Sequence, residues 1–247
     1  MQTVKLNNGI EMPILGYGVF QVSPEECERC VLDAISVGYR LIDTAQAYYN
    51  EEGVGNAIAK CGVPRDELFL TTKVWITNAG EEKATRSIDE SLRKLRTDYI
   101  DLLLIHQPFS DYPGTWRAME KALKAGKVRA IGLSNFYPDR FVDMAECAEI
   151  KPAVNQLKTN VFSQQWDAEA EMNPYNTRIM AWAPLAQGDP DLLTNSVLTA
   201  LAERYDKTVQ QVALRYLLQR GIIAIPKSTH IERMKQNLDV FDFTLTP

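Results

Sequence analysis

Residues 101–106 are Asp-Leu-Leu-Leu-Ile-His, an apolar run of strand length that ends on an ionisable side chain. Two earlier stretches have the same form: residues 39–43 are Tyr-Arg-Leu-Ile-Asp, and residues 68–73 are Leu-Phe-Leu-Thr-Thr-Lys. Short apolar runs bounded by turn or charge signals are typical of buried strands. If these strands are parallel, their carboxyl ends meet at one rim, which is where α/β folds place their chemistry. The sequence therefore predicts one site that contains Asp43, Lys73 and His106.

Strand-like runs alternate with helical patterns at regular spacings along the chain, which is typical of successive βα units around a parallel sheet. We expect eight strands, near residues 14–18, 40–43, 68–73, 99–106, 128–133, 153–157, 179–182 and 222–226. Helical patterns begin at Ser23-Pro24 and cover residues 87–95 and 210–219. Because the strands are evenly spread and nothing marks a second domain, we predict an α/β protein. It should be one (β/α)8 TIM barrel that spans residues 1–247 as a single domain.

Three short motifs refine this prediction. Asn-Gly at residues 8–9 lies between two short alternating segments and predicts an N-terminal β-hairpin that caps or plugs some other part of the fold. The Gly-Val-Gly at residues 53–55 is followed by Ile58 where a dinucleotide fingerprint needs glycine, so a dinucleotide would not bind by that motif. The CxxC at residues 27–30 lies inside a predicted helix and has no second cysteine pair, so we assign it no redox or zinc role and expect no metal.

Composition argues against several classes of partner. The chain has 247 residues, 45% of them hydrophobic, which is enough to bury a large core. A net charge of -5 and a pI near 5.2 argue against nucleic acid or an anionic membrane, since both require a clustered basic face. The N-terminal residues lack signal-peptide and transit-peptide character, and no run reaches membrane-spanning length. We expect a cytoplasmic protein.

The predicted rim site can donate a proton. Tyr48 follows Asp43 in the next loop, and a phenol with an ordinary pKa of about 10 exchanges its proton poorly at neutral pH unless a cation stabilises phenolate. Lys73 can supply that cation, and Asp43 keeps Lys73 in its ammonium form. His106 beside the phenol can donate a hydrogen bond, which completes a pocket for a carbonyl oxygen that gains negative charge. Such a pocket suits hydride addition to an aldehyde or ketone, and the adjacent Tyr49 is expected to point away.

Each member of this group also has a structural interpretation. Asp43 alone could cap a turn, and Lys73 alone could be a solvated strand end. His106 alone could be a satisfied core histidine, and Tyr48 alone a packed loop aromatic. A second chemistry is open as well, because a lysine on a barrel strand can form a Schiff base in a cofactor-free lyase. Lys73 would then be the nucleophile.

The chain resembles the aldo-keto reductases over nearly its whole length. The matching stretches are residues 12–18, 38–48, 72–75, 98–106, 126–135, 155–156 and 225–237. The resemblance implies a carbonyl reductase that depends on NADPH, built on a (β/α)8 barrel, with a catalytic tetrad. The implied tetrad is Asp43, Tyr48, Lys73 and His106. In this family the tyrosine is the general acid and hydride comes from the nicotinamide ring, so Tyr48 would be the acid here.

The same resemblance implies a set of cofactor-binding residues. Ser134, Asn135 and Gln156 would hold the carboxamide, Trp182 would stack on the ring, and Lys227, Ser228, Arg233 and Asn237 would hold the 2′-phosphate end. This last group follows the last strand and starts the last helix, where barrels bind phosphate, and it adds two cations to an acidic protein. Without an anion, those cations would oppose the helix dipole. The expected cofactor is therefore NADPH rather than NADH.

The substrate side is less determined. Phe20 and Trp75 are expected at the pocket mouth, although either could pack in the core. Small aldehydes and ketones are the expected substrates, including sugar-derived ketones, α-dicarbonyls and quinones, and the protein is expected to act as a monomer. A third hypothesis is a regulatory module that binds NADPH with little turnover.

Three features depart from the family pattern. Lys158 stands where the family usually has an acidic residue, and such a charge reversal should require a new partner. The segment 187–194 is shorter than the loop that folds over the cofactor in many relatives, so cofactor exchange should be quick. The given sequence ends at Pro247, without the tail that closes one pocket wall in larger members, so we expect an open pocket with broad, weak binding.

Overall fold

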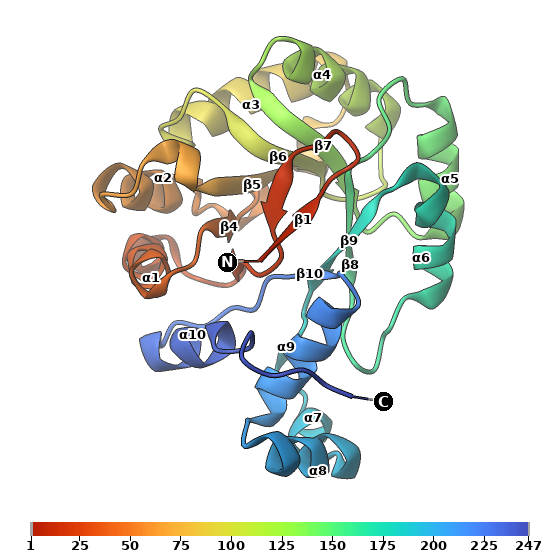
Figure 1. Cartoon of the computed structure of the whole chain (residues 1–247). Coiled ribbons are helices and arrows are strands. Elements are labelled where there is room, and N and C mark those ends of the chain that lie inside the picture. The colour runs from red at the N-terminus through yellow and green to blue at the C-terminus, as the bar shows by residue number, and fades with distance from the viewer. Residues whose placement is uncertain (1, 247) are drawn as a thin grey trace.

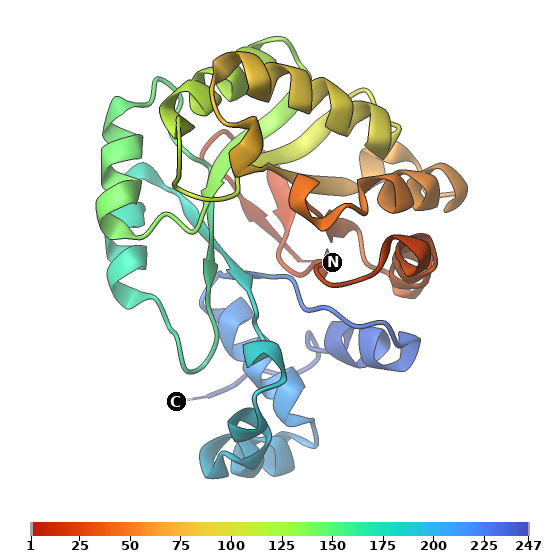
Figure 2. The ribbon, with the colours of Figure 1, turned by 180° about the vertical axis from the view of Figure 1, so that it is seen from behind.

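The computed structural model describes residues 2–246 and has the predicted barrel. Eight parallel strands form one sheet in sequence order, and each pairs with its neighbours (Figures 1 and 2). They are β3 (Tyr17–Gly18), β4 (Leu41–Asp43), β5 (Phe69–Val74), β6 (Ile100–Ile105), β7 (Val128–Ser134), β8 (Val154–Lys158), β9 (Arg178–Trp182) and β10 (Ile223–Ala224). All eight predicted strands are confirmed, with ends that differ by a few residues.

Backbone hydrogen bonds close the barrel beside β3. Leu15 and Ala224 form a parallel bridge, in which the Gly16 amide donates to the Ala224 carbonyl at 2.8 Å. Gly18 makes this close approach possible, because a Cβ on it would lie 3.1 Å from the Ile225 carbonyl oxygen. Gly16 leaves room for the neighbouring strand β4, since its Cβ would lie 2.4 Å from Leu41 Cγ.

Helices surround the strands, and their termini follow local sequence signals. They are α1 (Pro24–Val37), α2 (Glu51–Lys60), α3 (Glu81–Leu95), α4 (Tyr112–Lys124), α5 (Pro138–Cys147), α6 (Trp166–Met172), α7 (Pro190–Thr194), α8 (Ser196–Tyr205), α9 (Val209–Gln219) and α10 (Ile231–Leu238). As predicted, α1 begins after Ser23, whose hydroxyl accepts a hydrogen bond from the Glu26 amide. The helix predicted over 87–95 begins earlier, at Glu81. Acidic side chains in its first turn stabilise the N-terminus of the helix.

The N-terminal hairpin closes one end of the barrel, as predicted. Its strands β1 (Thr3–Lys5) and β2 (Glu11–Pro13) are antiparallel and cross the end that faces the viewer in Figure 1. Leu6 and Met12 are buried among the apolar side chains of the barrel interior. The Asn7 and Asn8 side-chain amides donate to the carbonyls of Pro152 and Arg129 at 2.9 and 3.0 Å. The carboxyl ends of the strands lie at the opposite end, which faces the viewer in Figure 2.

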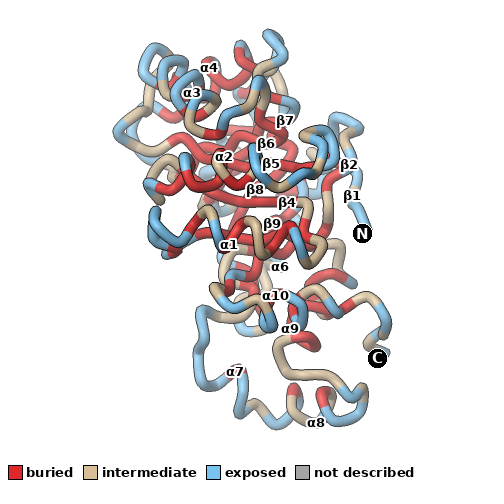
Figure 3. Tube along the Cα trace, turned by 90° about the vertical axis from the view of Figure 1, so that its left-hand side faces the viewer, coloured by how far each residue is buried: buried red, intermediate tan, exposed pale blue. Residues whose placement is uncertain are grey.

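Burial is concentrated in the strands and in the inner faces of the helices, whereas α7 and α8 project from one end of the molecule (Figure 3).

Gly53 and Gly55 lie in α2, and a Cβ on Gly55 would be 2.2 Å from the Lys94 carbonyl, so this glycine serves helix packing. Cys27 and Cys30 are free and buried in α1. Within residues 2–246, no helix combines the length and the apolar character that crossing a membrane would need.

Candidate active site

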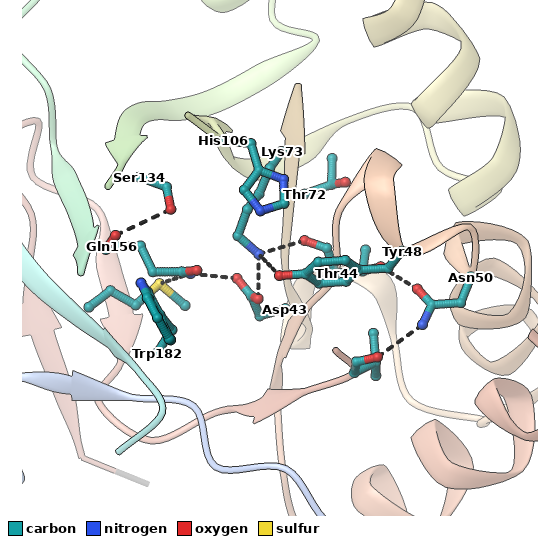
Figure 4. Close-up of polar contacts among 12 residues, drawn as sticks. Asp43, Thr44, Tyr48, Asn50, Thr72, Lys73, His106, Ser134, Gln156 and Trp182 are labelled. Atoms are coloured by element: carbon teal, nitrogen blue, oxygen red, sulfur yellow. Dashed lines mark hydrogen bonds and ion pairs between the residues drawn. The ribbon is translucent and has the colours of Figure 1, made fainter. Parts of the chain in front are cut away.

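The barrel brings the four side chains of the predicted tetrad together at its accessible rim (Figure 4). Asp43 is the last residue of β4, and Lys73 is one residue from the end of β5. His106 directly follows β6. Tyr48 ends a short 3₁₀ helix, Gln46–Tyr48, in the loop after β4. The adjacent Tyr49 is 81% exposed and points away from the site, as predicted.

Lys73 is fully buried, and all three protons of its ammonium group have acceptors. Its Nζ donates to Asp43 Oδ1 at 2.6 Å, to the Thr44 carbonyl at 2.9 Å and to Tyr48 Oη at 3.3 Å. Burial alone would lower the pKa of Lys73, but the Asp43 carboxylate and the Tyr48 hydroxyl raise it above its ordinary value. These contacts favour the ammonium form of Lys73.

Asp43 is the counter-ion of Lys73 and also binds Gln156. Burial raises the pKa of the Asp43 carboxyl, while Lys73 and Gln156 lower it, and an ammonium at 2.6 Å keeps the carboxylate charged. Gln156 Nε2 donates to Asp43 Oδ2 at 2.8 Å and to Met180 Sδ at 3.2 Å. Gln156 therefore supports the tetrad directly, and its Oε1 makes no hydrogen bond within residues 2–246.

Tyr48 keeps its proton in the isolated protein. Burial raises its pKa above 10, Lys73 lowers it, and Asp43 raises it further, so the net direction is upward. Desolvation therefore outweighs the attraction of the Lys73 ammonium, whose charge Asp43 offsets. The 3.3 Å contact with Lys73 Nζ nevertheless places a cation where phenolate charge would develop.

His106 is a neutral imidazole at the edge of two aromatic rings. Burial, with a contribution from the Lys73 charge, lowers its pKa to about 3. Its ring lies 5.6 Å from the Tyr48 ring and 4.9 Å from the Trp75 ring, in edge-to-face geometry. His106 Nδ1 is buried without a hydrogen-bond partner in the described part of the chain. A neutral imidazole can donate one hydrogen bond without bringing a second cation into the site.

A single cleft of about 990 Å³ runs from this tetrad to the start of α10. The predicted site residues that line it are Phe20, Asp43, Tyr48, Trp75, His106, Ser134, Asn135, Gln156, Trp182, Lys227, Ser228, Arg233 and Asn237. Lys73 does not line the cleft, because it is buried next to Asp43 and Tyr48. Along the cleft, Ser134 ends β7 and Trp182 ends β9. Trp182 Nε1 donates to Asn135 Oδ1 at 2.9 Å.

The far end of the cleft has the donors that a phosphate group needs. Lys227 and Arg233 are exposed, and neither makes an ion pair among residues 2–246. Asn237 is only 6% exposed, lines the cleft, and has no side-chain hydrogen bond within that range. Ser228 is also buried, and its backbone carbonyl accepts a hydrogen bond from the Tyr17 hydroxyl at 2.5 Å. Two cations without a counter-charge and an unused amide can bind an anion here.

Phe20 and Trp75 lie beside the tetrad at the mouth of the cleft, where their sequence positions place them. Phe20 is 48% exposed, and its ring lies 5.1 Å from that of Tyr48. Trp75 is half-buried and contacts His106. Both line the cleft, which excludes the alternative that they fill the barrel core.

The structure shows how two of the departures from the family pattern, Lys158 and the segment 187–194, are accommodated. Lys158 is exposed and makes no ion pair among residues 2–246, so the expectation that it needs a new partner within the protein is wrong. The segment 187–194 forms the end of a 3₁₀ helix, Ala186–Gly188, followed by α7. Its Gln187 and Leu192 side chains line the cleft.

Sequence reasoning missed two carboxamides behind the tetrad, Gln46 and Asn50. Asn50 directly precedes α2, so its position in the sequence indicates a helix N-cap. Its side chain, however, makes no capping hydrogen bond. It bonds instead to Thr44 and to the loop after β3, which Figure 4 shows in part. Gln46 had no signal in the sequence, because its partners come from the distant loop after β5 and from α3.

The fold and the cleft define a TIM-barrel protein with ionisable side chains at the carboxyl ends of its strands, which is the arrangement of barrel enzymes. Residues 14–247 match the model of the Aldo/keto reductase family. The chain is 48% identical to glyoxal reductase of Bacillus subtilis (strain 168) over 246 residues, which cover 99% of this chain and 88% of that protein. The chain therefore belongs to the aldo/keto reductase family of oxidoreductases.

Solved structures agree with this assignment. An aldo/keto reductase from Brucella melitensis has a TM-score of 0.95 at 42% identity, over 99% of this chain and 95% of that one. An aldo-keto reductase from Bombyx mori in complex with NADP has a TM-score of 0.94 at 38% identity, over 100% of this chain and 90% of that one.

Proposed function

We propose that this protein reduces aldehydes and ketones to alcohols with NADPH, and that Tyr48 is the general acid. The observation that carries the proposal is the contact of 3.3 Å between Tyr48 Oη and the buried Lys73 ammonium, beside a cleft of about 990 Å³ that Tyr48 lines. Tyr48 and His106 both line that cleft, so a carbonyl oxygen can reach the two donors together.

In this mechanism, bound NADPH supplies the hydride that the carbonyl carbon accepts. Tyr48 donates its phenolic proton to the carbonyl oxygen, which yields the alcohol and leaves a phenolate. Lys73, held by Asp43 at 2.6 Å, stabilises that phenolate until the proton is replaced. His106 donates a hydrogen bond to the same oxygen and favours the polarised carbonyl.

The residues of the cleft support NADPH as the cofactor. Ser134, Asn135 and Gln156 have polar side chains around the tetrad and would hold the carboxamide, with the Trp182 ring as a stacking surface. Lys227, Ser228, Arg233 and Asn237 would hold the 2′-phosphate. The two unpaired cations support NADPH over NADH, because only NADPH brings an additional phosphate to that end.

The substrates that we propose are small neutral carbonyls, including α-dicarbonyls. A relative of similar length is named glyoxal reductase. The tetrad end of the cleft is lined by the aromatic rings of Phe20 and Trp75 and by the carboxamides of Gln21 and Gln107. Since His106 is neutral, this end attracts carboxylate substrates no more than neutral ones.

The Schiff-base lyase is a weaker candidate. A Schiff-base lysine must be an accessible neutral amine, whereas Lys73 is fully buried and its pKa is raised. No observation favours a regulatory module without turnover. A single cytoplasmic domain that acts as a monomer on small molecules, without nucleic acid or membrane as a partner, stays a prediction.

Substitution of Tyr48 tests the proposal. We expect Tyr48→Phe to lower carbonyl-dependent NADPH oxidation by at least about two orders of magnitude, because the proton donor is lost. NADPH binding, followed by quenching of tryptophan fluorescence, should change by no more than a few fold. Tyr49→Phe is the matched control, since it removes a hydroxyl from the adjacent exposed tyrosine. Turnover by Tyr48→Phe at the rate of Tyr49→Phe would exclude Tyr48 as the acid.

A further inference from the structure

The backbone segment that carries Tyr48 is not rigid by its own sequence. We call residues 46–50 the tyrosine turn. It consists of a 3₁₀ helix of three residues without a side-chain cap, and it continues into Tyr49 with a left-handed φ of 57°. Helices of this kind have poor hydrogen-bond geometry, and a left-handed tyrosine is unfavourable. Such a segment persists only where its surroundings determine its conformation.

Gln46 fixes the first residue of the tyrosine turn to the loop after β5 and to α3. Its Oε1 accepts hydrogen bonds from the Trp75 amide and from Asn78 Nδ2, both at 2.9 Å. Its Nε2 donates to the Ser87 carbonyl at 3.2 Å and to Ser91 Oγ at 3.1 Å. Both donors and both lone pairs of the carboxamide are therefore used, so the side chain has one favourable orientation.

Asn50 fixes the last residue of the same turn, and it is 1% exposed. Its Oδ1 accepts from Thr44 Oγ1 at 2.8 Å, and its Nδ2 donates to the carbonyls of Val19 and Val22 at 3.0 and 3.1 Å. Thr44 in turn accepts a hydrogen bond from Lys73 Nζ on its carbonyl oxygen. Asn50 thus joins the turn to the residue that holds the ammonium ion (Figure 4).

The loop that Asn50 binds also contacts the phenol. Val19 and Val22 flank Phe20, whose ring lies 5.1 Å from the Tyr48 ring. The position of the Tyr48 hydroxyl is therefore set by its backbone turn on one side and by Phe20 on the other. Its hydrogen bond to Lys73, at 3.3 Å, is the longest of the three that Lys73 makes, so it is the one that a small backbone shift would break.

We propose that Gln46 and Asn50 are positioning residues that clamp the tyrosine turn at both ends and hold the Tyr48 hydroxyl against Lys73. Neither touches the cleft chemistry itself. The inference rests on the proposed role of Tyr48 as general acid. It adds that the geometry of this acid depends on two carboxamides outside the tetrad.

Isosteric substitutions separate positioning from general stability. Gln46→Met and Asn50→Leu keep the side-chain size and remove the hydrogen bonds. Gln211 offers a matched control, because its carboxamide also makes four hydrogen bonds, to Thr208 and Asp239, but lies on α9 away from the tetrad. Gln211→Met therefore removes as many hydrogen bonds as Gln46→Met without touching the tyrosine turn.

Two readouts are needed. Steady-state kinetics give kcat and the KM for NADPH. Labelling with 3-fluorotyrosine gives ¹⁹F NMR signals from the ten tyrosines, and the Tyr48 signal is assigned by its absence in Tyr48→Phe. We expect Gln46→Met and Asn50→Leu to lower kcat by about tenfold to a hundredfold, as small misplacements of a catalytic group do. The KM for NADPH should stay within about twofold, and the Tyr48 signal should shift or broaden.

Gln211→Met should lose a comparable amount of thermal stability and leave kcat and the Tyr48 signal unchanged. Gln46→Glu, which keeps both acceptor bonds, should recover part of the kcat that Gln46→Met loses. The clamp is refuted if the tyrosine-turn variants behave like Gln211→Met, or if Gln46→Glu recovers nothing. A wild-type protein that reduces no carbonyl would refute the proposed function instead, and the ¹⁹F signal would still decide the clamp.

Discussion

Acidification should lower the free energy of unfolding of this protein through His106, by an amount that can be calculated. The pKa of His106 falls from an ordinary 6.5 to about 3 because the ring is buried beside the Lys73 ammonium. Between these values the unfolded chain binds a proton and the folded chain does not. Stability therefore rises with pH across this window and is lost as the pH falls. At about 1.4 kcal/mol per pKa unit, the loss by pH 4 is about 3 kcal/mol of the free energy of unfolding.

A comparison with His106→Asn isolates this contribution. Urea unfolding of both proteins at pH 8, 6, 5 and 4 gives a difference in the free energy of unfolding at each pH. The packing cost of the substitution is the same at every pH. The only other histidine, His230, is present in both proteins, so its contribution to the pH dependence cancels in the difference. We expect the advantage of the wild type to shrink by about 3 kcal/mol from pH 8 to pH 4. A difference that stays constant with pH would show that folded His106 accepts a proton normally, and the assignment of a neutral imidazole would be lost.

Two further predictions concern the barrel. Asp101 is fully buried and accepts hydrogen bonds from Arg65 and Arg129 at 2.7 Å, so Asp101→Ala should lower the free energy of unfolding by about 3–5 kcal/mol in urea titrations. A loss below 1 kcal/mol would contradict this (~1 kcal/mol being typical of a surface pair). Gly16→Ala should cost about 1–3 kcal/mol and lower the melting temperature, because its Cβ would lie 2.4 Å from Leu41 Cγ on the neighbouring strand β4. An unchanged melting temperature would show that Leu41 can move aside.

The strands and the tetrad could be predicted because their signals are local. Asp43, Lys73 and His106 each stand where an apolar run ends, and parallel strands necessarily bring such ends to one rim. The hairpin at residues 8–9 is likewise a local turn signal. In each case the local residue pattern alone determines where the residue lies in the folded protein.

The remaining features depend on contacts between distant segments. Gln46 is fixed by residues more than twenty-five positions away, and nothing in its neighbourhood indicates which backbone amide it will meet. The direction of the Tyr48 pKa shift depends on how completely the loop after β3 covers the ring, which the sequence does not state. Lys158 was expected to need a partner, yet only the structure shows that its side chain is exposed.

The Lys73 charge links these observations. In a buried site a lone ammonium would lose its proton, and the Asp43 carboxylate prevents this at 2.6 Å. Burial, with a contribution from the same charge, lowers the pKa of His106, so the imidazole stays neutral and can donate a hydrogen bond without adding a second cation. Burial meanwhile keeps the pKa of Tyr48 raised, so the phenol retains its proton until an acceptor lies beside it. Phenolate formation then turns a neutral contact at 3.3 Å into an ion pair, and this stabilisation exists only after proton transfer. An interaction that strengthens along the reaction lowers the barrier, whereas one equally strong at the start would only tighten binding.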